Sequence, residues 1–241
     1  MSQQVSTSAD IQQDRLVIDQ YWARFLGCNH TDLRSGRDRL LYHRASPGIF
    51  SLTVNRSRVI SLRPGVPTLP SEVSLTPSVV RQALRGMGAI EEIYGPAVVM
   101  YGHRGEFRPR DERNAQLLDS PEDRTNLLRF AKLVGWQEYV HQTVVFWDYA
   151  FGIYQDGTLA AVATATIWGG ILGALKVATA PDYRRRGLGG AVVSAATRWM
   201  LENTRLIPQY DTASVNTASR KLGASLGYRE YGSIFYGKLA L

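Results

Sequence analysis

Three arginines and three glycines stand together at residues 184–190, where the sequence reads RRRGLGG. An apolar stretch that is expected to be a strand precedes this segment, and a helix is expected from about Gly187 to Asn203. The first N–H groups of a helix have no partner within it and lie at the positive end of its dipole. Glycines let an anion approach the main chain, and arginines provide forked donors that suit phosphate. This loop is therefore predicted to bind a diphosphate.

Known phosphate-binding motifs narrow the kind of site that this loop could form. A dinucleotide fingerprint, G-x-G-x-x-G, would require a glycine at position 192, where Val192 stands. A P-loop would require G-x-x-x-x-G-K, and no lysine follows these glycines. The pattern that remains is Arg184-x-x-Gly187-x-Gly189 between a strand and a helix. A glycine-rich turn with solvated arginines would also explain the segment.

A second motif agrees with the loop and points to a family. The pattern R-x-x-G-x-G resembles the acetyl-CoA signature of the GNAT acyltransferase superfamily. The segment NTASRKLGASLGY, from Asn216 to Tyr228, resembles that superfamily's second motif, in which an asparagine after a strand opens a helix that ends in Leu-Gly-aromatic. The order of elements expected after about residue 105 also resembles this superfamily: a strand, two helices, three antiparallel strands, the loop, a helix, a strand, a helix and two strands.

The resemblance implies roles for individual residues at the donor site. The main-chain N–H groups of the loop would hold the CoA diphosphate, and the amide near Val177 in the preceding strand could polarise the thioester carbonyl. Asn216 would bind the pantetheine arm and Ser219, one turn later, could assist; the alternatives are a helix cap for Asn216 and solvent exposure for Ser219. The implied donor-binding residues are Leu175, Val177, Thr179, Arg184, Arg185, Arg186, Gly187, Leu188, Gly189, Gly190, Asn216 and Ser219.

The catalytic acid and base are less well marked in the sequence. Members of the superfamily often carry a tyrosine seven residues after the asparagine, as the acid that protonates the departing thiolate, but Gly223 holds that position here. Tyr228 is the candidate acid, with a place in the core as its alternative, and a thiol with a pKa near about 8.5 can also leave with little help. Glu138, in the stretch GWQEYVH, is expected to line the acceptor cleft as general base, with Asp148 and His141 as rivals. No metal site is expected from the spacing of the possible ligands.

Turn and cap signals predict the elements that position these residues. In the first part of the chain they indicate a helix that ends at Gly27, a strand, a hairpin around residues 55–58, a capped helix in TPSVVRQALRGMG and a strand in GPAVVMYG. In the second part they indicate a strand in EFRP, a helix between Ser120 and Gly135, and a short helix in WQEYVHQ. Three strands with tight turns then lead to the loop, and REYGSIFYGKLAL is expected to close the chain as a strand pair.

Composition and charge exclude several classes of protein. The chain is globular in composition, with 44% hydrophobic and 20% charged residues. Cys28 is the only cysteine, so no intrachain disulfide can form and a cytoplasmic location is expected. The uncharged stretch 157–175 could span a membrane by length, but its Gly169-Gly170 pair favours two buried strands joined by a turn. The net charge of +7 is spread over both halves, which suits an acidic small ligand and leaves nucleic-acid binding as an alternative.

These expectations combine into one fold and one function. The expected fold class is α/β with an α+β mixed sheet: a GNAT-like domain at residues 105–241 and a smaller α/β domain at residues 1–104 that resembles a degenerate copy of the same fold. The resemblance implies an N-acetyltransferase that transfers an acetyl group from acetyl-CoA to a primary amine of an unknown acceptor, by direct attack while both substrates are bound. The N-terminal domain could shape the acceptor cleft or a homodimer contact. The alternatives are a CoA-binding regulatory module without turnover and a basic nucleic-acid-binding protein.

Overall fold

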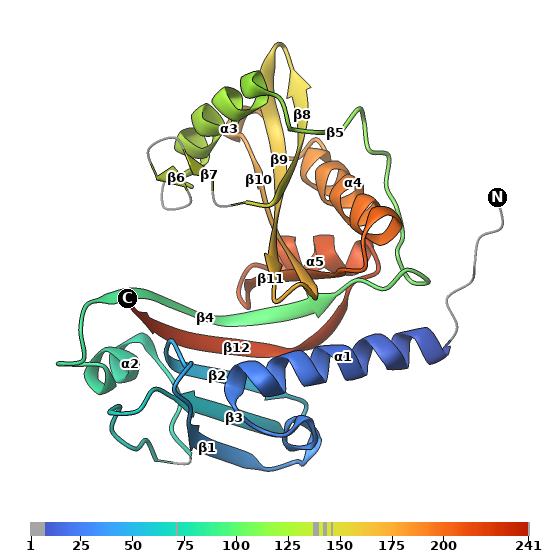
Figure 1. The fold of residues 1–241 in the computed structure, drawn as a ribbon. Helices are drawn as coiled ribbons and strands as arrows, with labels where there is room; N and C mark the ends of the chain where they lie inside the picture. Colours follow the sequence, from blue (N-terminus) through green and yellow to red (C-terminus); the bar gives the residue numbers. More distant parts are fainter. Residues whose placement is uncertain (1–7, 71, 137–139, 142–143, 146, 241) are drawn as a thin grey trace. The chain divides into compact units, whose positions relative to one another are not determined.

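The computed structural model describes residues 8–70, 72–136, 140–141, 144–145 and 147–240. These residues form two compact units, which are described separately below (Figure 1). Unit 1 comprises Tyr101–Asp211 and Lys221–Arg229, and unit 2 comprises the described residues up to Met100, Thr212–Arg220 and the residues from Glu230 onward. The division of the chain into domains 1–104 and 105–241 stays a prediction.

Unit 2 is built on strands β1–β4 and β12. Its sheet has the order β1-β3-β2-β12-β4, in which β1 pairs parallel with β3, and β2 pairs antiparallel with both β3 and β12. The elements are α1 (Ser8–Leu26), the 3-10 helix η1 (His30–Arg34), β1 (Asp38–Tyr42), β2 (Gly48–Val54), β3 (Ser57–Leu62), α2 (Pro77–Ala83), β4 (Ile90–Tyr101) and β12 (Arg229–Leu239).

The two helices of unit 2 cover opposite faces of its sheet. Phe50 of β2 lies opposite Tyr236 of β12, the two rings stack with centroids 5.4 Å apart, and Trp22 and Phe25 of α1 pack on Phe50. Ile49, the preceding residue, points to the other face because side chains alternate along a strand. There it belongs to a buried cluster that includes Val80 and Leu84.

Unit 1 contains the predicted donor loop. Its sheet has the order β11-β10-β9-β8-β5, and β6 and β7 form a separate pair. Strands β8, β9 and β10 are successive antiparallel neighbours, and β10 pairs parallel with β11. The elements are β5 (Gln116–Leu117), α3 (Pro121–Val134), β6 (Val140–His141), β7 (Val144–Val145), β8 (Tyr149–Gln155), β9 (Thr158–Trp168), β10 (Leu172–Thr179), the 3-10 helix η3 (Pro181–Tyr183), α4 (Leu188–Asn203), β11 (Ile207–Ala213) and α5 (Thr217–Ser225).

Helices α3 and α4 cover opposite faces of strands β8–β10 (Figure 1). Leu127 and Phe130 of α3 belong to a buried cluster with Ala150 of β8. Its neighbour Tyr149 points the other way and packs on Trp199 of α4, with ring centroids 4.3 Å apart. Ser120 accepts a hydrogen bond from the N–H of Asp123 and caps α3, which ends as predicted at a left-handed glycine, Gly135.

The mixed α/β class is confirmed, and three local expectations are wrong. The stretch EFRP is not a strand, because Glu106 and Phe107 both donate their N–H groups to the carbonyl of His103 in a turn. In WQEYVHQ, residues 140–141 form strand β6 instead of a helix, and pair with two β-branched valines of β7. The last segment is one long strand, β12, and not a pair.

The two glycines inside β12 do not interrupt it. A glycine within a segment often marks a turn. In the structure a Cβ at Gly232 would overlap the main-chain oxygen of Thr53, and a Cβ at Gly237 would overlap Val80. Both glycines therefore allow close packing within a continuous strand and do not end it.

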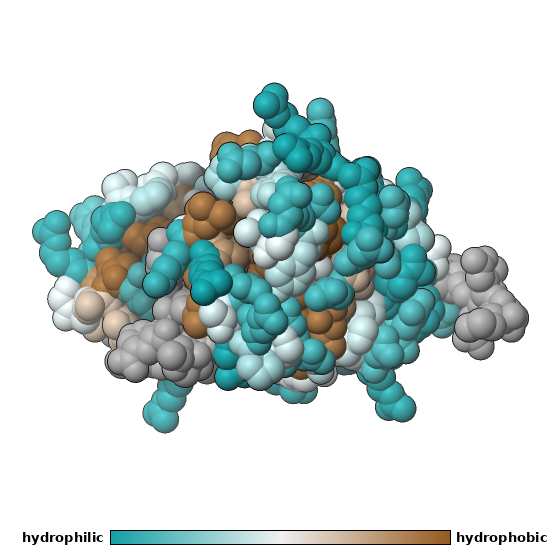
Figure 2. Space-filling view, turned by 90° about the horizontal axis from the view of Figure 1, so that it is seen from above, coloured by the Kyte–Doolittle hydropathy of each residue, from teal (hydrophilic) through white to brown (hydrophobic). Residues whose placement is uncertain are grey.

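No helix in the described part of the chain is both long and apolar enough to cross a membrane. The uncharged stretch 157–175 instead forms all of β9 and the first half of β10, joined by a turn at Gly169 and Gly170. On the face seen in Figure 2, hydrophilic residues predominate and hydrophobic ones gather in small separate patches.

Candidate functional site

The loop between β10 and α4 leaves a run of main-chain N–H groups without partners. Arg185 has a left-handed backbone with φ of 62°, and Gly187, the residue before the helix, has φ of 79°. The first hydrogen bond into α4 runs from the N–H of Ala191 to the carbonyl of Gly187, at 3.1 Å. Within the described residues, the N–H groups of residues 185–190 have no acceptor. The positive end of the α4 dipole therefore carries unpaired donors of the kind that bind anions, and the binding of a diphosphate by this loop stays a prediction.

The three arginines of the loop are held in different ways. Arg184 donates from Nε to the carbonyl of Thr179, at 3.3 Å. Arg186 donates from Nη2 to the carbonyl of Asp182, at 3.0 Å, and lies over the ring of Tyr183. Arg185 is exposed and has no partner in the part of the chain that the structure describes. Two guanidinium groups are thus fixed beside the loop while the third is available.

Gly189 lets the start of α4 lie directly against the end of β10. A Cβ at this position would stand 3.2 Å from Oγ1 of Thr179 and 3.8 Å from Cγ2 of Val177. The first distance is tighter than ordinary van der Waals contact, so a side chain here would require the Thr179 side chain or the helix to shift slightly. The glycine therefore keeps the unpaired N–H groups next to the strand that the sequence predicts for the pantetheine arm.

The pairing between strands β10 and β11 ends before β10 itself ends. Their parallel pairing ends at Leu175 and Tyr210, whereas β10 remains paired with β9 as far as Thr179. The N–H of Ile207 donates to the carbonyl of Ile171, so the odd-numbered residues of β10 direct their main-chain groups toward β11. The N–H groups of Val177 and Thr179 consequently face a side with no paired strand. Only the structure could show that the unpaired edge begins at this point, because it depends on strand register.

Asn216 and Ser219 make the contacts of a helix start. Oδ1 of Asn216 accepts the N–H of Ser219 at 3.1 Å, and its carbonyl accepts the N–H of Arg220 at 3.1 Å. The helix-cap alternative is therefore observed for Asn216. Asn216 and Ser219 belong to unit 2 and the loop belongs to unit 1, and their contact with pantetheine stays a prediction.

Tyr228, the candidate acid, lies in the core of unit 1. Its side chain is 4% exposed, and its hydroxyl lies 2.7 Å from Oγ1 of Thr197. Since Thr197 donates its own proton to the carbonyl of Val193, the Tyr228 hydroxyl must be the donor to Thr197. Burial raises the pKa of the Tyr228 phenol well above its usual range. Its role as acid stays a prediction, and these surroundings weigh against it; Gly223 is itself buried in α5.

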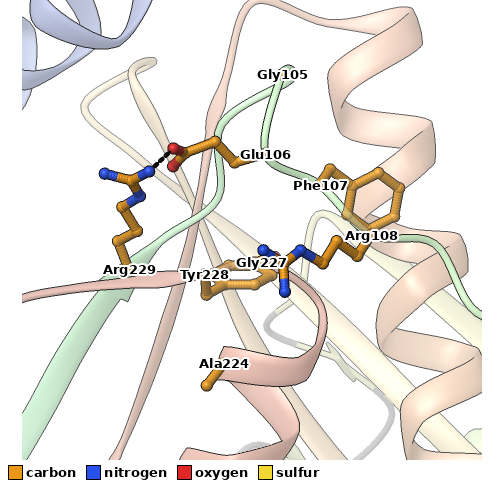
Figure 3. Close-up of a pocket in the computed structure, with 8 residues that line it drawn as sticks. All are labelled: Gly105, Glu106, Phe107, Arg108, Ala224, Gly227, Tyr228 and Arg229. Atoms are coloured by element: carbon orange, nitrogen blue, oxygen red, sulfur yellow. Dashed lines mark ion pairs between the residues drawn. The ribbon is translucent and has the colours of Figure 1, made fainter.

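Tyr228 also borders a cavity of about 400 Å³ within unit 1 (Figure 3). Glu106 and Arg229 form an ion pair at this cavity, and Arg108 also lines it. The lining residues are Gly105, Glu106, Phe107, Arg108, Ala224, Gly227, Tyr228 and Arg229. Residues 184–190 do not line this cavity, so it is distinct from the predicted donor loop.

The candidate bases cannot be assigned from geometry. Glu138 lies outside the described residues, and the side chain of His141 is likewise not described. Asp148 is exposed and its carboxylate accepts the N–H of Ile167 at 2.6 Å. The base therefore stays a prediction. Among the described residues no group of His, Cys, Asp and Glu could hold a metal ion.

Arg113 contacts the loop although it precedes Arg186 by 73 residues. Its Nη1 donates to the carbonyl of Arg186 at 2.6 Å. No sequence motif marks this residue. The only signal for it was the run of arginines in RPRDER, which has no spacing that ties it to a motif.

Comparisons with known proteins agree with this picture. Residues 129–233 match the family model for GNAT acetyltransferase. No curated protein matches the sequence. This segment contains β10, the loop, α4, β11 and the Asn216 motif.

Solved structures share the fold at low sequence identity. A protein from Novosphingobium aromaticivorans assigned to the GNAT family is 21% identical, with 63% of this chain and 68% of that chain covered and a TM-score of 0.48. A GNAT-family acetyltransferase from Colwellia psychrerythraea is 16% identical over 66% of this chain and 61% of its own, with a TM-score of 0.48. A Drosophila protein is 16% identical over 67% of this chain and 57% of its own, with a TM-score of 0.52. The chain thus spans less than two thirds of the length of the last two.

The family assignment depends on the match to the family model, and the structural similarity to the Drosophila protein supports the fold alone. Residues 129–233 therefore belong to the GNAT acetyltransferase family.

Proposed function

We propose that the chain is an N-acetyltransferase that transfers an acetyl group from acetyl-CoA to a primary amine of an unidentified acceptor. One observation carries this proposal: the start of α4, with its unpaired N–H groups, packs on Val177 and Thr179, which lie in the part of β10 beyond its pairing with β11. A diphosphate fits the helix start, and an extended, amide-containing arm fits the strand edge. CoA joins these two chemical parts in one molecule.

The proposed reaction depends mainly on positioning. The loop N–H groups would hold the diphosphate, and the pantetheine arm would pair with β10 beyond Leu175. The N–H of Val177, which has no strand partner on that side, would donate to the thioester oxygen as negative charge develops there. The amine would attack the thioester carbon directly while both substrates are bound. The C–N bond forms, the C–S bond breaks and the CoA thiolate leaves, while the nitrogen gives up a proton to the general base, for which Glu138 is proposed. Because a thiol has a pKa near about 8.5, this leaving group needs little protonation near neutral pH.

Two finer parts of the proposal depend on the family resemblance: the acetyl group as opposed to a longer acyl group, and Glu138 as the base. The cytoplasmic location depends on the presence of a single cysteine, Cys28. A homodimer formed through the N-terminal part is also part of the proposal. The acceptor is a small molecule or a peptide amine, and the fold does not select between them.

The test is a thiol-release assay with acetyl-CoA and a panel of amines. We expect release that depends on the added amine and that falls strongly in Gly189→Glu, which places bulk and charge in the donor loop. Arg205→Gln is the matched control, because Arg205 is exposed and carries no described contact with the loop. Amine-independent release, or equal rates in all three proteins, would contradict the proposal.

A regulatory CoA-binding module is the second candidate function. Gly223 in place of the usual tyrosine and the buried hydroxyl of Tyr228 favour it, since neither position offers an accessible acid. CoA binding in calorimetry without thiol release from any amine would support this candidate. DNA binding that persists at saturating acetyl-CoA and weakens with salt would instead favour a nucleic-acid-binding protein.

A further inference from the structure

The segment from Arg110 to Asn114 is fixed along helix α4. The N–H of Arg110 donates to Oγ of Ser194, at 2.9 Å. The carboxylate of Glu112 accepts from Oγ of Ser194 at 3.2 Å and from Nε of Arg198 at 2.9 Å. Ser194 and Arg198 both belong to α4. The segment therefore keeps a fixed position relative to the helix whose N-terminus forms the donor loop.

Arg113 lies against the first glycine of the loop. Besides its bond to the Arg186 carbonyl, its Nη2 would stand 3.6 Å from a Cβ placed at Gly187. Its Nε lies 3.6 Å from the exposed carboxylate of Asp111. A guanidinium has five N–H donors, so Arg113 keeps donors available after these two contacts.

Arg110 lies at the other end of the loop. Its Cδ and Nη1 would stand 3.4 Å and 3.8 Å from a Cβ at Gly190. Its side chain is exposed and makes no hydrogen bond or ion pair with the residues that the structure describes. The fixed segment thus directs one free and one partly free guanidinium toward the ends of the loop.

The charges around this loop are not balanced. Five arginines, the three of the loop with Arg110 and Arg113, lie near unpaired N–H groups. Among the described residues of these two segments the carboxylates are Asp111, Asp182 and Glu112, and Glu112 is engaged by Arg198. Like charges held close together repel, and an anion that binds among them relieves that repulsion. CoA carries a 3′-phosphate in addition to its diphosphate, so it presents anionic groups both to the loop N–H groups and to arginines beside them.

We propose that Arg110 and Arg113 bind a phosphate of the nucleotide end of the acyl donor, as specificity-determining residues outside the R-x-x-G-x-G motif. This inference rests on the proposed function, because it takes CoA as the donor. The phosphate is either the 3′-phosphate or the diphosphate, and the shared chemistry is a charge-assisted hydrogen bond from a guanidinium.

Calorimetric titration with CoA and with dephospho-CoA, which lacks the 3′-phosphate, tests the inference. We expect Arg110→Gln and Arg113→Gln each to raise the Kd for CoA by about 10-fold, as for loss of one charge-assisted hydrogen bond, and Arg205→Gln to leave it unchanged. A loss seen with CoA and not with dephospho-CoA assigns the contact to the 3′-phosphate. An equal loss with both assigns it to the diphosphate.

Salt separates a direct ionic contact from a change in loop shape. The difference between the wild type and each variant should shrink as ionic strength rises, because a direct contact is screened. A difference that persists at high salt would show that the arginine only shapes the loop and would overturn the inference for that residue. If Arg110→Gln and Arg113→Gln bind CoA as tightly as Arg205→Gln does, the inference is wrong but the proposed function is unaffected. A wild-type protein that does not bind CoA overturns the proposed function as well.

Discussion

Gly189→Glu should change the affinity for CoA without lowering the stability of the fold. The residue is the second of α4, and its Cβ would face Thr179 at 3.2 Å. A shift of a few tenths of an ångström would accommodate the Cβ. A carboxylate in the first turn interacts favourably with the helix dipole by about 0.3–1 kcal/mol, and replacing glycine in a helix contributes up to about 1 kcal/mol. The melting temperature should therefore stay constant or rise.

The same carboxylate should repel the ligand. Two unit charges about 5 Å apart interact by about 3 kcal/mol at an effective dielectric constant of about 20. That energy corresponds to about a 100-fold increase in the Kd for CoA. Gly189→Gln has nearly the same shape without the charge and is the matched variant. Gly189→Gln should therefore lose only the part of the CoA affinity that depends on the size of the new side chain.

Calorimetry with CoA and thermal unfolding of both variants provide the assay. We expect the glutamate variant to bind CoA far more weakly than the glutamine variant, although both unfold at or above the wild-type temperature. Equal affinities for the two variants would show that no anionic group lies near the start of α4. Wild-type affinity in the glutamate variant would refute the placement of the diphosphate altogether.

Three further predictions concern residues around the site. Tyr228→Phe removes the donor to Thr197 and should lower the free energy of unfolding by about 1 kcal/mol in urea titrations without changing kcat; a large fall in kcat at unchanged stability would make Tyr228 the acid. Burial raises the pKa of the Asp123 carboxyl, but hydrogen bonds from Ser120 and Tyr154 outweigh it and hold this pKa below its usual range. The ionised Asp123 carboxyl therefore stabilises the fold above its unfolded pKa of about 3.9, and this stabilisation is lost as the pH falls through its pKa in the folded state. Below about pH 4 the melting temperature should fall more steeply in the wild type than in Asp123→Asn. Parallel pH profiles of the two proteins would contradict this. Gly135→Ala forces a side chain into a backbone with φ of 79° and should cost about 1 kcal/mol, whereas Gly135→Asn should cost less; equal melting temperatures would show that the left-handed end of α3 is not needed.

Local chemistry made much of unit 1 predictable. Ser120, Pro121 and Gly135 mark the ends of α3 by capping rules that act within a few residues. The turns at Asp156-Gly157 and at Gly169-Gly170 follow from glycines with positive φ. The R-x-x-G-x-G motif predicts Gly187 and Gly189 as ligand contacts. The structure shows that Gly187 supplies a left-handed backbone and that Gly189 permits contact with β10, and both support the predicted role of the loop.

Features that depend on distant residues could not be predicted from the sequence. The separation of β10 from β11 after Leu175 is a matter of register, which no local pattern in either strand records. Arg113 reaches the loop only because Glu112 and Ser194 hold its segment along α4. The closing segment was expected to be a strand pair, but β12 is continuous, and the reason for its glycines Gly232 and Gly237 is in each case a neighbour far away in the sequence.

The most direct test of the central claim is to titrate the protein with CoA and to monitor the main-chain amide signals of residues 185–190 by heteronuclear NMR. We predict large shifts of these amides with CoA and little change with pantetheine, which lacks the diphosphate. Binding of CoA that leaves these amides unchanged while others shift would contradict the account.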